Sequence, residues 1–142
     1  MAENEIIAVQ DVRNELSSDA RSTFCSVQGG DRVTLAKVYN AMNNPKHKVA
    51  DFINKVIEVK DVFVELIDLP DEETGELTSA KRVVLIDGKG EAYQAVSEGV
   101  FNAIKNAMQV FGQPTWDDPI PFLVRQISVK NGSMLTLEVK LA

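Results

Sequence analysis

The stretch that decides the fold is KVIEVKDVFVELIDL, residues 55–69. Apolar and polar residues alternate along it, as they do in a strand with one buried face. Ile57 and Val59 are apolar at odd positions, whereas Val62, Val64 and Leu66 are apolar at even positions, with the switch at Lys60-Asp61. One extra residue in a strand moves the following side chains to the other face, as in a β-bulge. The pattern therefore predicts a long, bulged and bent strand, which a small barrel requires.

Further elements follow this strand along the chain. We expect two strands joined by a Gly-rich turn at 87–90, one helix, and two strands joined at Asn131-Gly132, with the ranges 81–87, 91–96, 98–111, 121–129 and 134–141. Ser97 is a candidate N-cap for the helix, and Gly112 is positioned to end it. The apolar residues between them recur at helical spacing, which indicates one buried helix face.

The order of these elements from residue 55 is strand, strand, strand, helix, strand, strand. This is the order of the OB-fold, a five-stranded Greek-key barrel whose second and third strands bind oligonucleotides or oligosaccharides. Upstream, residues 22–27, Gly29-Gly30 and residues 32–42 predict an extra N-terminal hairpin, although 32–42 also fits a helical period. We therefore expect a mainly β fold, a β-barrel with one helix, over residues 22–142.

The charge of the chain is unevenly distributed. A net charge of -6 argues against a nucleic-acid partner, because phosphate binding rests on Lys and Arg. Residues 1–21 contribute -3, however, residues 70–80 contribute -4, and the remainder of the chain is +1. The body is therefore free to hold a basic groove, and we expect the acidic loop 70–80 to point away from a bound strand.

Composition also excludes several classes of protein. The chain of 142 residues suits one domain with a substantial core. Its single His and single Cys offer no metal-ligand spacing, and no GxxxxGK[ST], GxSxG or HExxH motif is present. We expect no metal, no cofactor and no catalytic residues. No apolar run approaches the roughly 20 residues of a membrane span or resembles a signal peptide, which predicts a cytoplasmic protein without membrane contact.

Residues 1–21 form a polar N-terminal tail with a short apolar segment. Its apolar side chains are Ile6, Ile7, Ala8 and Val9. The segment is either part of a frayed terminus or a docking element that lies on a neighbouring copy as an added strand or short helix. In the second interpretation Ile6, Ile7 and Val9 are oligomerisation residues.

Three segments carry a family resemblance. They are RVVLIDGKGEAYQAVSEGVFNAIKNAMQVFGQPTWDDPI at 82–120, YNAMNN at 39–44 and DFINKVIEVKDV at 51–62. Together they resemble the single-stranded DNA-binding proteins of phages and conjugative plasmids of Gram-positive bacteria, over about residues 22–141. The resemblance implies an OB-fold protein that coats single-stranded DNA without sequence preference during replication or conjugative transfer. It leaves open whether single-stranded RNA also binds.

Sequence-tolerant binding needs aromatic faces for bases and cations for phosphates. The candidates are the aromatic and basic residues expected on the binding strands, at their ends and in the N-terminal hairpin: Tyr93, Trp116, Phe63, Tyr39, Lys37, Lys81, Arg82, Lys89, Arg125 and Lys130. Each has a structural alternative. Trp116, between two prolines, could plug the end of the barrel, and surface lysines are ordinary.

Two other classes compete with this interpretation. In the first, the barrel and the Ile6–Val9 segment form a protein-interaction module that serves an assembly without nucleic acid. In the second, Asp87, Asp117 or Asp118 holds a divalent ion in an enzyme, although carboxylates after Trp116 are more simply part of a helix-exit loop. The favoured hypothesis is a non-enzymatic protein that binds single-stranded DNA, with several copies associated along one strand.

Overall fold

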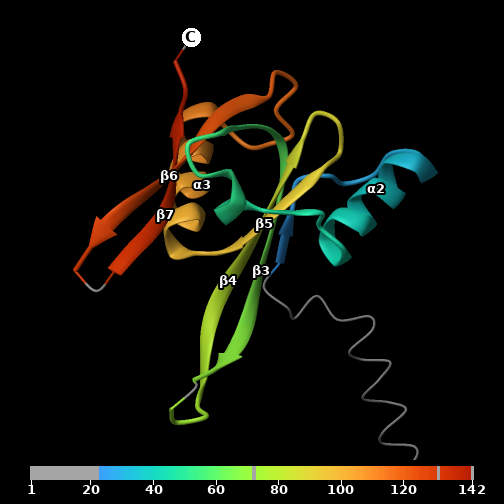
Figure 1. Cartoon of the computed structure of the whole chain (residues 1–142). Coiled ribbons are helices and arrows are strands. Elements are labelled where there is room, and N and C mark those ends of the chain that lie inside the picture. Colours follow the sequence, from blue (N-terminus) through green and yellow to red (C-terminus); the bar gives the residue numbers. More distant parts are fainter. Residues whose placement is uncertain (1–22, 72, 131, 142) are drawn as a thin grey trace, which may run out of the picture.

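The computed structural model describes residues 23–71, 73–130 and 132–141 (Figure 1). The strands in these ranges are β1 Thr23–Cys25, β2 His47–Lys48, β3 Val56–Pro70, β4 Leu77–Asp87, β5 Ala92–Val96, β6 Ile120–Val129 and β7 Gly132–Val139. The helices are α2 Arg32–Asn43, the 3-10 helix η1 Val49–Phe52 and α3 Glu98–Phe111. The predicted oligomerisation residues Ile6, Ile7 and Val9 lie outside the described residues.

The strands form one strongly curled sheet. Its order is β2-β5-β4-β3-β6-β7, and β1 pairs with β3. From β3 onward the order is strand, strand, strand, helix, strand, strand, so the mainly β, OB-like fold predicted from the sequence is confirmed. The described strands make a half-barrel, because β5 and β7 are not hydrogen-bonded to each other. A pocket of about 350 Å³, lined in part by Gln94, Val96 and Leu135, lies between them.

The predicted bulge in β3 is confirmed. The pairing with β4 passes from Val59 opposite Asp87 to Asp61 opposite Ile86, which leaves Lys60 as the extra residue. Ile57 and Val59 before the bulge and Val62 after it all belong to the main core. The bulge therefore keeps the apolar residues on one side of a strand whose alternation changes phase.

A second, smaller core lies on the outer face of the sheet. Phe63, Val84, Ile86 and Ala92 are buried there together with Ala41 of α2. The helix lies against this outer side (Figure 1). Successive residues of β4 are consequently buried on both faces of the sheet, which explains the unbroken apolar run Val83–Ile86.

The extra N-terminal hairpin predicted for this region is wrong. Only Thr23–Cys25 forms a strand, and Arg32–Asn43 is helical. The Asp31 side chain caps the helix by accepting a hydrogen bond from the Thr34 backbone N–H at 2.8 Å. Gly29 and Gly30, with φ of 115° and 123°, form the connection rather than a hairpin turn. The cap and the helical period of 32–42 thus determined this element.

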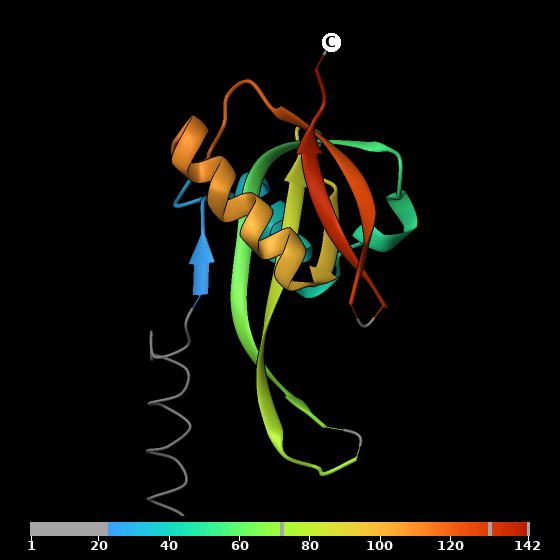
Figure 2. The same ribbon diagram turned by 90° about the vertical axis from the view of Figure 1, so that its left-hand side faces the viewer.

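Helix α3 lies across the curled sheet, as Figure 2 shows. The expected cap is present, since the Ser97 hydroxyl accepts from the Val100 N–H at 3.2 Å, and Gly112 follows the last turn at φ 86°. Val100, Ile104 and Ala107 form its buried face. None of the helices in the described ranges is long and apolar enough to cross a membrane.

Beyond the barrel, β3 and β4 continue as a paired arm. We call the arm residues 66–81; its paired ends are Pro70 and Leu77. The arm projects from the body of the molecule in both views (Figures 1 and 2). The acidic residues Asp71, Glu73 and Glu76 belong to the connection between these ends, and the tip of the arm lies far from α2 in Figure 1. That this loop points away from a bound strand stays a prediction.

Candidate nucleic-acid interface

The three aromatic residues expected to stack on bases within the barrel are buried. The exposed fractions are 3% for Phe63, 7% for Tyr93 and 6% for Trp116. Phe63 belongs to the core under α2, and the Trp116 indole N–H donates to the Gly112 carbonyl at 3.1 Å. A base has no access to these rings in this structure. We therefore leave all three out of the proposed interface. Trp116 belongs to the main core.

Tyr93 belongs to a small aromatic cluster at the β2–β5 edge. His47 stacks on its ring with centroids 4.8 Å apart, and Phe52 meets it edge-on at 5.0 Å. The Tyr93 hydroxyl donates to Asp87 Oδ2 at 3.0 Å. Burial of the phenol, together with this hydrogen bond and the nearby negative charge, raises the pKa of Tyr93 to about 12. This geometry fixes β2 and η1 against β5.

Three of the predicted cations are paired with carboxylates. Lys81 lies 2.8 Å from Glu98, Arg82 lies 3.1 Å from Glu65, and Arg125 lies 3.8 Å from Glu138. The Lys81 and Arg125 pairs are at the surface, where an ion pair contributes little and can be exchanged. Their charges are nonetheless partly neutralised in the free protein.

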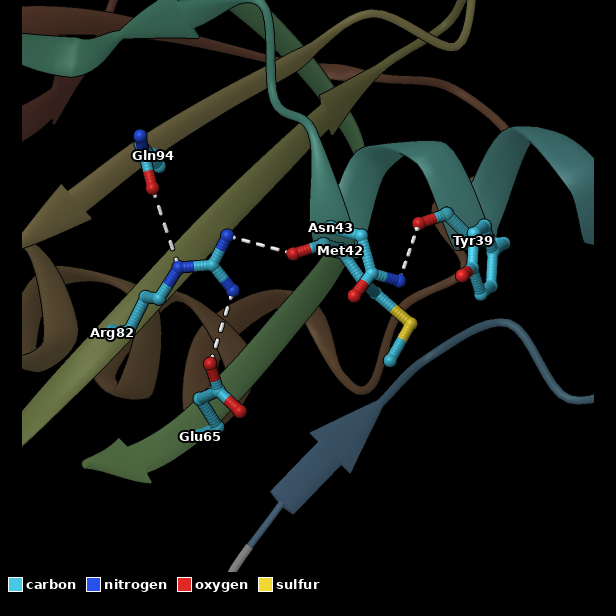
Figure 3. A network of polar contacts seen from close by, with 6 residues as sticks. All are labelled: Tyr39, Met42, Asn43, Glu65, Arg82 and Gln94. Atoms are coloured by element: carbon cyan, nitrogen blue, oxygen red, sulfur yellow. Dashed lines mark hydrogen bonds and ion pairs between the residues drawn. The ribbon is translucent and has the colours of Figure 1, made fainter.

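Arg82 serves the fold (Figure 3). Its guanidinium donates to the Met42 carbonyl at 2.7 Å, to Glu65 at 3.1 Å and to Gln94 at 3.3 Å. These bonds join the last turn of α2 to β3, β4 and β5. Because its donors are engaged and its side chain is only 14% exposed, Arg82 is better described as the tether of α2 than as a phosphate ligand.

Other predicted lysines gather in an open pocket between α2 and the β4–β5 turn. We call it the lysine cradle; its volume is about 320 Å³ and its polar lining includes Lys37, Asn40, Asn44, Lys46 and Lys89. Among the described residues none forms an ion pair with these three lysines. Glu91, which lies 3.5 Å from His47, also belongs to the lining, so the cradle presents three lysines and one carboxylate beside amide groups.

Local structure explains how the cradle forms. Lys37, Asn40 and Asn44 follow the spacing i, i+3, i+7, which places them on one side of α2. The β4–β5 turn approaches closely, because a Cβ at Gly90 would lie 3.2 Å from Lys37 Cδ. Gly90 also has φ 88°, which a side chain would disfavour. The sequence prediction missed Asn40 and Asn44, since they share a side with Lys37 only if 32–43 is a helix, and it missed Lys46, which the chain brings to the pocket after the helix ends.

A smaller pocket continues the cradle. It measures about 120 Å³, shares Lys37 and Lys89 with the cradle, and adds Lys60 together with the carboxylates of Asp61 and Asp87, both of which accept hydrogen bonds from neighbouring residues. Lys60 is the bulge residue of β3, so the irregularity that bends the barrel also presents a cation at this end. Four lysines from α2, β3, the segment before β2 and the β4–β5 turn thus lie around two adjoining pockets.

The remaining predicted residues lie elsewhere. Tyr39 is 65% exposed on α2, about 200° around the helix from Lys37, and so faces away from the cradle. Lys130 is exposed in the turn between β6 and β7, and in Figure 1 this pair of strands lies on the opposite side of the molecule from α2. The structure therefore brings together Lys37 and Lys89 from the predicted set and separates them from Tyr39 and Lys130.

Comparison with known proteins identifies the family. The family model described as phage single-stranded DNA-binding protein matches residues 17–140. The chain belongs to this family. Neither the curated proteins nor the solved structures that were compared with the chain match it.

The family match confirms the phage part of the predicted resemblance and the single-stranded DNA partner. It covers the whole described barrel, including α2 and the lysine cradle. The conjugative-plasmid part stays a prediction. Within the described ranges, no three His, Cys, Asp or Glu side chains are grouped so that they could hold a metal ion.

Proposed function

We propose that this protein binds single-stranded DNA without sequence preference and coats it during phage replication, with the backbone phosphates held by the lysine cradle and Lys60. The observation that supports this most directly is the cluster of unpaired lysines in a member of a single-stranded DNA-binding family. Lysine is suited to this role because its flexible ammonium contacts phosphate as a point charge without reading bases.

Charge limits the affinity that the cradle can provide. A protein that neutralises about four phosphates of a single strand has a salt dependence of about -0.7 per phosphate, or a total slope near -3 in log K against log salt. We expect nanomolar-to-micromolar binding to oligo-dT that weakens steeply with salt. Stacking and shape must provide the rest, because the whole chain carries -6.

The first prediction concerns these lysines. Lys89→Gln, Lys46→Gln and Lys37→Gln should each weaken oligo-dT binding several-fold at low salt and reduce the salt slope by about 0.7, because each removes one phosphate contact. Fluorescence anisotropy over a salt series measures both quantities. Lys130→Gln is the matched control, since it removes the same charge from the far side of the molecule.

Two outcomes would contradict the proposal. Absence of oligo-dT binding by the unmodified protein at low salt would remove the DNA function and favour the protein-interaction module. Equal effects of Lys89→Gln and Lys130→Gln would show that net charge matters and the cradle does not. Parallel titrations with oligo-U and with mixed-sequence DNA measure RNA binding and sequence preference.

Self-association along the strand is part of the proposal. The apolar residues Ile6, Ile7 and Val9 are suited to contact a neighbouring copy, because a short apolar segment in a polar tail has no core of its own. A chain lacking residues 1–14 should form smaller assemblies, with and without oligo-dT, in sedimentation experiments. An unchanged molar mass would exclude these residues from the assembly.

We also propose that the protein is not an enzyme. Asp87, one of the candidate carboxylates, accepts hydrogen bonds from the backbone N–H groups of Lys89 and Glu91 at 2.9 Å each and from the Tyr93 hydroxyl. These bonds give it a structural role in the β4–β5 turn. Cleavage of labelled DNA in the presence of magnesium would overturn this part.

A further inference from the structure

An apolar pocket between β1, β3 and α3 is not used by the lysine cradle. We call it the Phe24–Phe101 slot after the two rings that line it; its volume is about 330 Å³. Phe24 comes from β1 and Phe101 from α3. Within the described chain the two rings make no ring-to-ring contact, so neither covers the face of the other.

The rim of the slot is cationic and polar. Lys105 lines it, is exposed, and has no ion-pair partner among the described residues. The Lys81 ammonium, which pairs with Glu98, lies over the Phe101 ring at 4.8 Å from its centre, so a base would stack on Phe24 or take the place of this ammonium. The exposed amides of Gln109 and Gln113 also belong to the lining. An amide both donates and accepts hydrogen bonds, so it can meet the edge of any base.

The slot lies close to the cationic pockets. The pocket that contains Lys60 also includes Val27 and Asp61. Asp61 accepts hydrogen bonds from Ser26 and Thr115, which joins the loop after β1 to the loop after α3. Phe24 precedes Ser26 by two residues and Gln113 precedes Thr115 by two. The Ser26–Asp61–Thr115 bridge therefore links the Lys60 pocket, through Asp61, to the two segments that carry Phe24 and Gln113.

From these observations we propose that the Phe24–Phe101 slot binds a base of the same DNA strand whose phosphates lie in the lysine cradle. This inference rests on the proposed function. A single strand needs both an aromatic surface and a cationic path, and the slot provides the first at the end of the second. A cationic rim with amides suits a nucleotide, whose phosphate and base edge are polar, better than an apolar protein segment.

The slot offers accessible aromatic rings, which the buried candidate stacking residues do not. Phe63, Tyr93 and Trp116 are buried, whereas Phe24 and Phe101 are only partly buried and border an open pocket. Bases of any identity have a π-face, so binding in the slot does not require sequence preference. The slot thus makes the buried positions of the other aromatic residues compatible with single-strand binding.

The test combines two proteins with two strands. The double variant Phe24→Leu/Phe101→Leu keeps apolar bulk but removes both rings. Oligo-dT and a strand of abasic residues carry the same phosphates, and only oligo-dT can stack. We expect the unmodified protein to prefer oligo-dT over the abasic strand by about tenfold or more, and the variant to lose most of that preference while its binding to the abasic strand changes less than twofold.

Phe111→Leu is the matched control. Phe111 also lies on α3 and is 48% exposed, but it borders a different pocket. It should leave the preference for oligo-dT unchanged. Circular dichroism establishes that each variant is folded. If the double variant does not fold, photocrosslinking of the unmodified protein to oligo-dT that contains 5-iodouracil decides, with adducts expected at Phe24, Phe101 or Met108.

The failure of this inference is distinct from the failure of the proposed function. If the unmodified protein binds oligo-dT and the folded double variant shows the same preference, or if all crosslinks lie elsewhere, the slot is not a base site although the DNA function holds. If the double variant alters only the molar mass of the assembly, the slot is a protein-docking surface. No binding of oligo-dT by the unmodified protein overturns both.

Discussion

At the scale of single residues, the hydrogen bonds and ion pairs that a side chain already makes distinguish a structural residue from a candidate DNA ligand. Arg82 and Lys89 look equivalent in the sequence, as basic residues near the expected binding strands. Arg82 makes three hydrogen bonds that hold α2, whereas Lys89 has no ion pair with a described residue and lines the cradle. A cation that is already paired loses its partner when it binds phosphate, so unpaired lysines are the better ligands.

Tyr93 allows a prediction at this scale. Tyr93→Phe removes the hydrogen bond to Asp87 and should lower the free energy of unfolding near neutral pH by about 1 to 2 kcal/mol. Because the pKa of Tyr93 is raised to about 12 in the folded protein, its contribution is fully present below pH 10 and is lost as the pH rises toward 12. Urea unfolding between pH 7 and 11.5 measures this.

The variant provides the reference for the pH dependence. The unmodified protein should lose stability above pH 10 more steeply than Tyr93→Phe, which lacks the titrating hydroxyl. Parallel alkaline profiles of the two proteins would show that the Tyr93–Asp87 contact does not contribute.

At the scale of elements, close packing depends on a few small residues. A Cβ at Gly99 would lie 2.0 Å from the Leu135 carbonyl oxygen and 2.9 Å from Met134 Cγ. Gly99 therefore lets the first turn of α3 approach β7, where Ser97 also contacts Leu135. Since β5 and β7 do not pair, this helix contact joins the two ends of the curled sheet.

We predict that Gly99→Ala is destabilising although alanine favours helices. The methyl group must displace backbone, which costs about 1 to 3 kcal/mol or more and exceeds the helix-propensity gain of about 1 kcal/mol. Thermal unfolding followed by circular dichroism is the measurement. Asn102→Ala, at an exposed position of the same helix, is the control and should change stability by less than about 0.5 kcal/mol. A more stable Gly99→Ala protein would show that α3 does not pack closely on β7.

At the scale of the whole molecule, opposite charges are kept apart. The acidic tip of the arm lies far from α2 and the β4–β5 turn, two segments whose residues line the lysine cradle (Figure 1). A protein of net charge -6 can therefore present a positive surface to a strand, because screening limits the reach of the acidic residues to about 10 Å at 0.1 M salt.

The charge separation predicts a weak and salt-sensitive effect of the tip. Replacing Asp71, Glu73 and Glu76 by their amides should strengthen oligo-dT binding no more than about threefold at low salt, with no effect above about 0.3 M. Anisotropy titrations at several salt concentrations measure it, with Lys89→Gln for comparison. A tenfold or larger gain that persists at high salt would place the tip against the bound strand.

Local patterns in the sequence predict the strands, the bulge and the long helix of the barrel. The phase change at Lys60-Asp61, the cap at Ser97 and the turns at 87–90 and Asn131-Gly132 are local signals, and they specify the strands, the bulge and α3 because alternation and capping depend on neighbouring residues. The apolar pattern of 32–42 fits both strand and helix, and the Asp31 cap, a local signal that the hairpin prediction left out, begins the helix.

Only the tertiary structure decided which residues are accessible. Phe63 is buried under α2, Tyr93 is buried beside β2, and Trp116 is buried in the loop after α3. Lys46 and Lys89, in contrast, are 43 residues apart in the chain and line one pocket. Burial and pairing arise from contacts between distant segments, which no local pattern contains. The proposed binding surface therefore depends on how α2, β2 and the loop after α3 pack on the barrel.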